Sequence, residues 1–462
     1  MRQNSITEGS IPKQLLAFFF PIWMGTFFQL LYNTADAAIV GNFLGKEALS
    51  AVGGPTATIV NLLVNFFVGL ASGATVIIAQ HYGAHDAEGT SNAVHTAAAL
   101  CLAGGAVLTV VGVAASPAIL RLMNTPADVL PLAITYISIY FCGITGNIIY
   151  NIGSGVLRAV GDSRRPLYFL IVCSLSNVVL DLLFVVGFGM GGGGAALATI
   201  LSQAVSAYLV LQALMRTRES YRLELRRIRF HLPLLARILR IGLPAGIQSV
   251  MYSVSNMIIQ TSVNSFGTNT VAAWTAYGKI DGIFWMTVNS FGIAITTFAG
   301  QNFGARQYGR LRKSVRVCMG LAMGVAVLLS GFVLLAGGPL YRLFTSDRDV
   351  IAIGLRILFL LVPFYITYVP VEVYSGALRG AGDAVVPMLI TTCGICLLRI
   401  VWIFGVVPLH HEILFTCVCY PITWAATAVL FFVYYVRGRW LTRCKLRAGH
   451  ITQEQALAET RG

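Results

Sequence analysis

Two aspartates inside long apolar stretches are the residues best placed to do chemistry in this sequence. Asp36 follows Tyr32 by four positions and Asp181 follows Asn177 by four positions, so each pair shares one face of a helix. If these stretches cross a membrane, each carboxylate costs about 2.5–3.5 kcal/mol at the bilayer centre and needs a reason to be there. Ion binding is such a reason, because a carboxyl group shielded from water can take up a proton or a cation and later release it.

Hydroxyl and amide oxygens recur at the same spacing in another apolar stretch. Thr199 and Gln203 lie four positions apart and share a helix face. Carboxylate, amide and hydroxyl oxygens together suit a proton or a hard cation such as sodium. The structural alternative places Asp36 in water at the outer end of its segment and leaves Asp181 capped by neighbouring amides.

The composition identifies the elements that must position these groups. Only 11% of the 462 residues are charged, against about 25% in an average soluble domain, and 56% are hydrophobic. This balance excludes a soluble enzyme, a disordered chain and a disulfide scaffold, and it favours an all-α membrane protein. Twelve transmembrane helices are predicted near 14–38, 52–78, 93–118, 130–155, 167–188, 194–215, 241–264, 271–299, 314–337, 351–377, 386–408 and 413–436.

The distribution of basic residues orients these helices. An even number of spans places both termini on one side, and the loops on that side hold 24 of the 32 basic residues, against four on the other. Basic loops face the cytoplasm, so we expect a multi-pass protein of the cell inner (plasma) membrane with both termini cytoplasmic. We expect no cleaved signal peptide. The dense basic segment 216–240 indicates contact with anionic lipid rather than with nucleic acid.

The two halves of the sequence repeat each other. Residues 79–84 (AQHYGA) match 300–305 (GQNFGA), and residues 155–162 (GVLRAVGD) match 376–383 (GALRGAGD), both at an offset of 221. Two motifs in one register indicate a duplication. Six spans per repeat give both repeats the same orientation, related by a pseudo-two-fold axis along the membrane normal.

This repeat predicts the domain organisation. We expect an N-terminal six-helix lobe over 1–215, a basic cytoplasmic linker over 216–240, a C-terminal six-helix lobe over 241–437 and a cytoplasmic tail over 438–462.

The repeated motifs G-x-L-R-x-x-G-D and Q-x-x-G-A resemble those of the multidrug and toxic compound extrusion (MATE) family, over nearly the whole chain. Residues 32–36 (YNTAD) and 177–181 (NVVLD) look like the branch related to the DNA-damage-inducible exporters. The resemblance implies two six-helix lobes that form a V-shaped cleft. It also implies export of organic, often cationic, compounds coupled to a cation.

The resemblance also implies a site. The family's N-lobe cation site maps onto Asp36, Asn177, Asp181 and Thr199, with Tyr136 nearby. Aromatic side chains beside carboxylates suit flat organic cations. The residues expected in the substrate cleft are Tyr32, Tyr136, Tyr140, Gln203 and Glu372. We expect H⁺ or Na⁺ as the coupling ion, no further cofactor, small organic cations as partners within the lipid bilayer, and a monomer.

The second repeat lacks the acidic pair. At the offset of 221 positions, Met257 corresponds to Asp36 and Trp402 corresponds to Asp181. The coupling site is therefore expected only in the first lobe. For Glu372, two interpretations remain: a structural ion pair with Arg399 on the adjacent helix, or a second carboxylate for a cation or substrate.

Pro21 lies inside the first span, where a proline kinks a helix. The kink is either static or part of a conformational change, as has been proposed for the family.

Other classes of protein find little support in the sequence. It contains no P-loop and no G-x-S-x-G motif, so we expect neither ATP hydrolysis nor another enzymatic activity. Cys393 and Cys396 form a C-x-x-C within an apolar span and lack the loop spacing of a zinc site, so no metal centre is predicted. The remaining alternative is a lipid or oligosaccharide-lipid flippase of the same superfamily.

Overall fold

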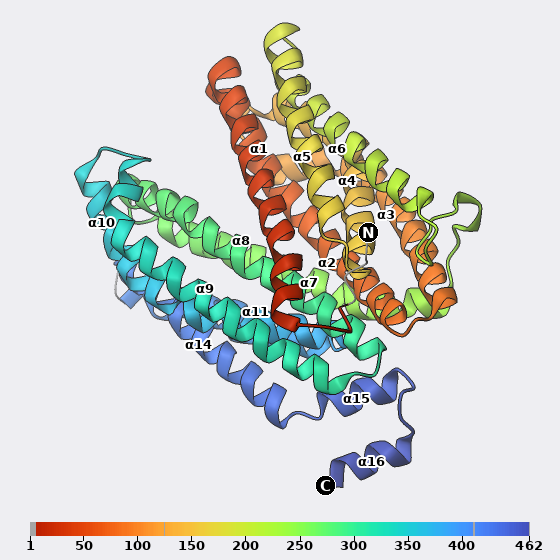
Figure 1. Ribbon diagram of the computed structural model, residues 1–462. Helices are drawn as coiled ribbons and strands as arrows, with labels where there is room; N and C mark the ends of the chain where they lie inside the picture. The colour runs from red at the N-terminus through yellow and green to blue at the C-terminus, as the bar shows by residue number, and fades with distance from the viewer. Residues whose placement is uncertain (1–5, 124, 410–411, 462) are drawn as a thin grey trace. The chain divides into compact units, whose positions relative to one another are not determined.

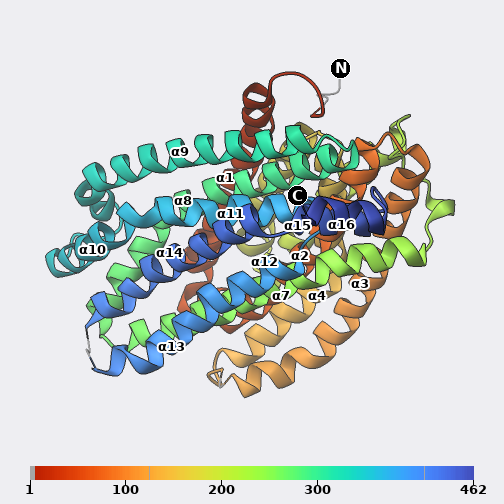
Figure 2. The same ribbon diagram turned by 90° about the horizontal axis from the view of Figure 1, so that it is seen from below.

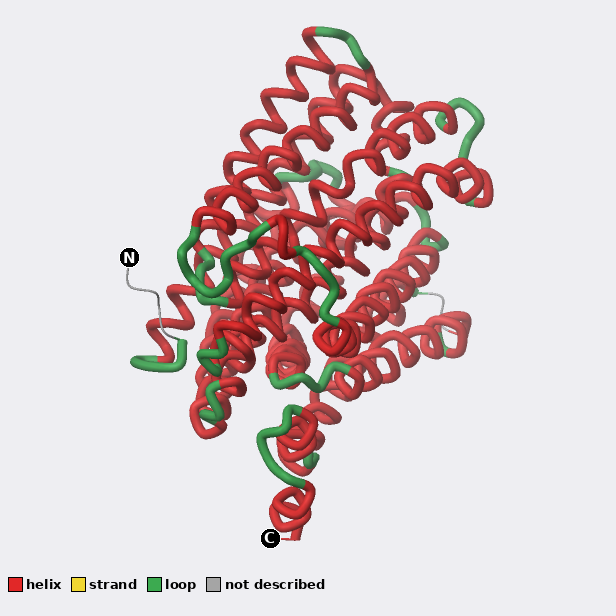
Figure 3. The backbone as a smooth tube through the Cα atoms, turned by 90° about the vertical axis from the view of Figure 1, so that its right-hand side faces the viewer, coloured by secondary structure: helices red, strands yellow, loops and turns green. Residues whose placement is uncertain are grey.

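The computed structural model describes residues 6–123, 125–409 and 412–461. All regular elements among these residues are helices, with no strand, and Figure 3 shows the helices joined by short loops. Twelve helical segments among them are long and apolar enough to cross a membrane. The predicted all-α membrane fold with twelve spans is thus confirmed.

The chain divides into two compact units. The first unit is Ala17–Gly246, and the second combines Ile6–Leu16 with Ile247–Gly462. Helices α1 (Ile11–Gly53) and α7 (Leu232–Asn264) each begin in one unit and continue in the other. The basic segment between the repeats lies wholly within the first unit.

In the first unit, α4 packs against α2, α3 and α6 (Figure 1). The helices between α1 and α7 are α2 (Pro55–Gly83), α3 (Ala87–Leu122), α4 (Leu130–Ala159), α5 (Arg164–Asp181) and α6 (Gly191–Arg216). A π-helical turn, Leu182–Gly187, follows α5 directly. Such turns often mark functional positions in a helix, and this one begins at the residue after Asp181.

In the second unit, α11 packs against α8, α9 and α14 (Figure 2). The helices after α7 are α8 (Thr268–Gly304), α9 (Tyr308–Arg342), α10 (Arg348–Leu361), α11 (Tyr365–Gly380), α12 (Val385–Thr391), α13 (Leu398–Gly405), α14 (Ile413–Arg437), α15 (Trp440–Arg447) and α16 (Gln453–Arg461). A 3₁₀ turn, Val362–Phe364, joins α10 to α11, and a π-helical turn, Thr392–Leu397, joins α12 to α13. The predicted spans ten and eleven are thus both interrupted helices.

The G-x-L-R-x-x-G-D motif makes the same helix contact in both repeats. A methyl group at Gly155 would lie 2.4 Å from the Thr75 Oγ1, and one at Gly376 would lie 3.0 Å from the Thr296 Oγ1. Thr75 and Thr296 are themselves 221 positions apart. The first glycine of the motif therefore allows α4 to approach α2, and α11 to approach α8, as small residues do between membrane helices.

A second close crossing lies within the first unit, between α2 and the start of α7. A methyl group at Gly73 would lie 2.3 Å from the carbonyl oxygen of Ile238 and 2.7 Å from the backbone nitrogen of Gly242. One turn away, Gly69 meets Gly246 in the same manner, at 2.5 Å from its nitrogen. The two backbones touch here because neither helix carries a side chain at the crossing.

Candidate functional site

The two predicted acids of the first unit lie one helical turn from a buried apolar layer. Asp181 ends α5 and is fully buried, whereas Asp36 of α1 is partly exposed. Val40 lies four residues after Asp36 and Val185 four after Asp181, and these valines belong to one buried cluster. Since each valine lies one turn beyond its acid, the cluster brings the two acids to the same level of the unit. The two carboxyl groups are near enough to interact with each other.

Several polar atoms at this level are buried and have no hydrogen-bond partner. They are the Asp36 Oδ1, both carboxylate oxygens of Asp181, both amide atoms of Asn177 and the Gln203 Oε1. Among the described residues, no lysine, arginine or histidine forms an ion pair with either acid. Buried polar atoms are normally satisfied. All of these atoms except the Asn177 Nδ2, which is a donor, are acceptors that an added proton or cation would complete.

Two tyrosines lie near the acids, and a third stacks on one of them. The rings of Tyr136 and Tyr140 on α4 stack with centroids 6.5 Å apart. Tyr136 lies within interaction range of both Asp36 and Asp181, and Tyr32 within range of Tyr140 and Asp36. The first unit therefore brings together the two acids and the aromatic residues that were predicted to accompany them.

Helix α6 contributes Thr199 and Gln203 to the same region. Thr199 donates its hydroxyl to the carbonyl of Ala195 at 2.9 Å, which leaves the hydroxyl oxygen free to accept. Ala195 belongs to the same apolar cluster as Val40 and Val185, so Thr199 also lies one turn from that layer. Gln203 is buried and lies beside Tyr140.

The ion pair that the sequence suggested between Glu372 and Arg399 does not form. Arg399 is 2% exposed and its guanidinium lies 4.1 Å from the centre of the Tyr420 ring. It donates weakly to the Thr423 Oγ1 at 3.4 Å and to the Asn256 Oδ1 at 3.5 Å. The pairing was wrong because the guanidinium contacts residues of α7 and α14 instead.

Glu372 itself has other neighbours. Its carboxyl group lies beside Tyr368, and its main electrostatic interaction with a charged residue is with Arg379. It also fills the space above Gly292 of α8, where a methyl group would lie 2.2 Å from its Oε1.

Asp281 of the second unit is the centre of a hydrogen-bonded cluster that was not predicted from the sequence. The Tyr365 hydroxyl donates to the Asp281 Oδ1 at 2.5 Å, and the Trp285 indole donates to its Oδ2. Tyr277 shares a 3.0 Å contact with the Tyr365 hydroxyl. Both Asp281 oxygens are thus occupied by protein donors, unlike those of Asp181. The neighbouring Lys279 is exposed.

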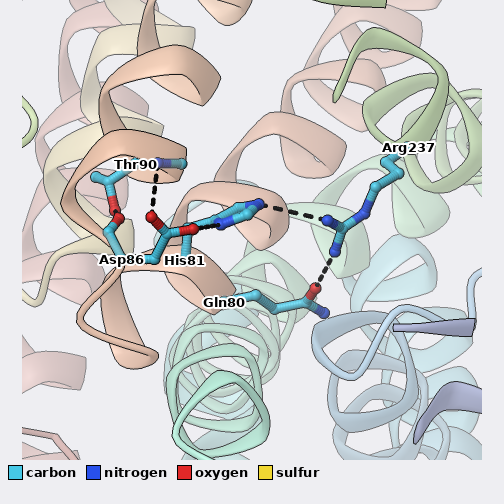
Figure 4. Close-up of polar contacts among 6 residues, drawn as sticks. Gln80, His81, Asp86, Thr90 and Arg237 are labelled. Atoms are coloured by element: carbon cyan, nitrogen blue, oxygen red, sulfur yellow. Dashed lines mark hydrogen bonds and ion pairs between the residues drawn. The ribbon is translucent and has the colours of Figure 1, made fainter. Parts of the chain in front are cut away.

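The Q-x-x-G-A motif builds a polar cluster at the end of α2 (Figure 4). Arg237 of α7 donates to the Gln80 Oε1 at 3.3 Å and lies 3.4 Å from the His81 Nε2. The His81 Nδ1 lies 2.7 Å from the Asp86 carboxylate. Asp86 is the N-cap of α3 and accepts from the backbone N–H of Gly89 at 2.8 Å. The motif thus joins α2, α3 and α7 within the first unit.

Removing the Asp86 cap is expected to destabilise the protein. The backbone N–H of Gly89 and then His81 hold the pKa of Asp86 below its ordinary value of 3.8. Asp86→Ala should cost about 1 kcal/mol, as other N-caps do, whereas Asp86→Asn keeps an acceptor and should cost less. A lowered pKa stabilises the fold above the unfolded-state pKa, and this contribution is lost as the pH falls through the folded-state value.

Thermal unfolding in detergent from pH 7 down to pH 3 measures this prediction. The gap between wild type and Asp86→Ala should be constant above about pH 5 and should narrow below about pH 4. Equal melting temperatures for the two proteins at pH 7 would show that the cap contributes nothing.

The described residues contain no group of three or more histidine, cysteine, aspartate or glutamate side chains placed to hold a metal ion. His410 and His411 lie outside the described residues.

Comparison with known proteins identifies the family. The model of the MatE family matches the chain twice, at residues 21–183 and 244–404. The chain belongs to the MATE family. The two matched regions follow the two repeats, and one of them spans Asp36 and Asp181. The MATE proteins are multidrug efflux transporters that cross the membrane many times, and the twelve spans of this chain agree with that architecture.

Relatives and solved structures agree along most of this MATE chain. The probable multidrug resistance protein YpnP of Bacillus subtilis is 32% identical, over 83% of this chain and 85% of its own length. YoeA of the same organism, with the same description, is 29% identical over 93% and 94%. A MATE crystal structure in the straight conformation is 25% identical with a TM-score of 0.88, covering 96% of this chain and 99% of that one. A MOP superfamily transporter of Pyrococcus furiosus gives 25% and 0.87 over the same shares.

Proposed function

We propose that this MATE protein is a secondary active antiporter that exports organic, cationic drug-like or metabolite compounds in exchange for H⁺ or Na⁺. The observation that carries the proposal is the set of buried, unpartnered acceptors on Asp36, Asn177 and Asp181. Such a set is incomplete without an ion. The relatives' description as multidrug resistance proteins supports export as the direction.

The site supports competition between ion and substrate. A proton or sodium ion bound between Asp36 and Asp181 neutralises one negative charge and so weakens the attraction of an organic cation to Tyr32, Tyr136 and Tyr140. Loss of the ion restores that charge. The concentration gradient of the entering ion drives the exchange, and any net elementary charge that crosses the membrane potential adds about 2.3 kcal/mol per 100 mV, so export against a gradient needs no ATP.

The proposal also covers the orientation of the chain in the membrane, the roles of further residues and the oligomeric state. The excess of basic loops on the side of the termini supports cytoplasmic termini in the cell inner membrane.

Thr199 and Gln203 are proposed as further oxygen ligands of the ion and substrate, and Glu372 as a carboxylate for the substrate in the second unit. Pro21 lies within a continuous helix and is proposed as the point where α1 bends. The transporter is proposed to act as a monomer.

Efflux of ethidium from preloaded cells tests the proposed function. Cells that express the chain should lose ethidium faster than cells with an empty vector. Collapse of the gradient of the coupling ion, which is the proton or the sodium gradient, should abolish the difference in efflux rate. Unchanged ethidium efflux, together with transbilayer movement of a labelled lipid in vesicles containing the protein, would contradict the proposed export and favour the flippase alternative.

A further inference from the structure

An apolar cavity lies in the first unit beneath the basic segment that joins α6 to α7. Its volume is about 100 Å³, and all thirteen lining residues are apolar side chains, glycine or cysteine. They come from α3, α4, α6 and the segment itself, and they include Val94, Cys101, Ile152, Leu214, Leu223 and Ile228. No polar group in this lining needs water or an ion.

The basic segment is fixed over the cavity. Tyr221 and Leu223 are buried, and the backbone N–H of Leu223 donates to the Leu214 carbonyl at 3.0 Å. The backbone N–H of Glu224 donates to the His95 Nε2 on α3 at 3.1 Å. The segment predicted as a linker is therefore a folded cover for one end of the first unit.

The cavity runs along the helices and reaches the surface at its rim. On α3 its lining extends from Val94 to Leu102, a distance of about 12 Å at 1.5 Å per residue. Leu102 is 49% exposed and Leu225 is 63% exposed. A chain of methylene groups lying parallel to the membrane helices fits this direction and this lining.

The segment that covers the cavity carries exposed positive charge. Arg222 and Arg226 are exposed, and each is next in sequence to a lining residue, Leu223 or Leu225. The nearby acid, Glu224, is 3.9 Å from Arg227. No ion pair involves Arg222 or Arg226 among the described residues. Two guanidinium groups therefore remain available to a phosphate, which arginine binds with two parallel hydrogen bonds.

We propose that this cavity is a binding site for an anionic phospholipid. Part of one acyl chain occupies the cavity between α3, α4 and α6, the rest of that chain lies beyond the exposed rim, and Arg222 and Arg226 bind the phosphate-bearing headgroup. The combination of an apolar channel parallel to the helices with arginines at its end matches a lipid and no water-soluble anion. The inference rests on the proposed orientation in one respect: anionic lipids are concentrated in the cytoplasmic leaflet, where the proposed function places this segment.

Photolabelling of the full chain tests the site. The protein is placed in symmetric vesicles that contain phosphatidylglycerol or phosphatidylcholine with the same diazirine-bearing acyl chain, and labelled peptides are mapped by mass spectrometry. Phosphatidylglycerol should label residues 94–102 and 149–156 several times more than phosphatidylcholine. Arg222→Gln combined with Arg226→Gln should reduce phosphatidylglycerol labelling to the level of phosphatidylcholine labelling. Arg312→Gln with Lys313→Gln, two exposed charges of the second unit, should leave it unchanged.

A second pair of variants tests the acyl-chain cavity. Ala98→Phe fills the cavity and should abolish labelling by either lipid at the buried lining residues Val94 and Cys101, whereas Ala103→Phe, exposed on the same helix and outside the lining, should not. Monodisperse elution shows that each variant is folded. Equal labelling by the two lipids, or labelling that survives Ala98→Phe, would overturn the proposal. Because symmetric vesicles present both lipids at both faces, the result is independent of orientation and transport, and a failure of ethidium export would leave it standing.

Discussion

Asp181→Asn is expected to lower gradient-driven export by about tenfold or more, within the range of coupling free energies between two binding sites. Asparagine has the size of aspartate, so the buried site keeps its shape and loses the charge that an ion neutralises. Asp181 is fully buried and neither of its oxygens has a hydrogen-bond partner, so apart from the interaction with Asp36 the substitution breaks no side-chain hydrogen bond among the described residues.

Ethidium efflux at equal expression measures this effect. Asp128→Asn is the matched control, because it makes the same substitution at an exposed loop carboxylate of the first unit. The control should export at the wild-type rate. Export by Asp181→Asn at that rate would remove Asp181 from the coupling site, and a loss of export in both variants would point to a general effect on folding or expression.

Gly73→Leu is expected to have the largest effect on folding. Its first side-chain atom would lie 2.3 Å from the Ile238 carbonyl oxygen and 2.7 Å from the Gly242 nitrogen, both of which are backbone atoms that cannot rotate away. Forcing α2 and α7 apart should cost about 3 kcal/mol or more, at the upper end of overpacking effects. We expect little monodisperse protein after extraction in detergent.

Gly324→Leu is the control for this variant. Gly324 lies within α9, and a methyl group there meets nothing within 4 Å. The control should give a wild-type yield and an equal or higher melting temperature, since leucine favours a helix more than glycine does. A wild-type yield of Gly73→Leu would show that the close crossing of α2 and α7 contributes little.

The sequence predicted the membrane spans well and the ends of the helices less well. Apolar length decides whether a segment spans a bilayer, and all twelve predicted spans are helical. The first span was predicted to end near residue 38, yet α1 extends to Gly53. A helix continues for as long as its backbone hydrogen bonds are made, including beyond the apolar stretch. Hydropathy therefore locates a span and leaves the end of its helix open.

The candidate site shows the same division between local and tertiary information. The i, i+4 spacing of Asn177 and Asp181 is local and correctly placed both on one buried face. The pairing of Glu372 with Arg399 depended on the rotation of two different helices, which no local pattern specifies. Asp281 is an intermediate case: Trp285 lies four residues later, a signal visible in the sequence, whereas its other donor, Tyr365, comes from α11.

The most direct test of the central claim is substrate uptake into everted membrane vesicles, whose lumen corresponds to the cell exterior. A lumen that is loaded with acid or with sodium should drive uptake of an organic cation by the wild-type chain under one of the two gradients. Asp36→Asn and Asp181→Asn should show almost no gradient-dependent uptake, while Asp128→Asn should match the wild type. Full gradient-dependent uptake by both Asp36→Asn and Asp181→Asn would contradict the account, because the ion would then bind elsewhere.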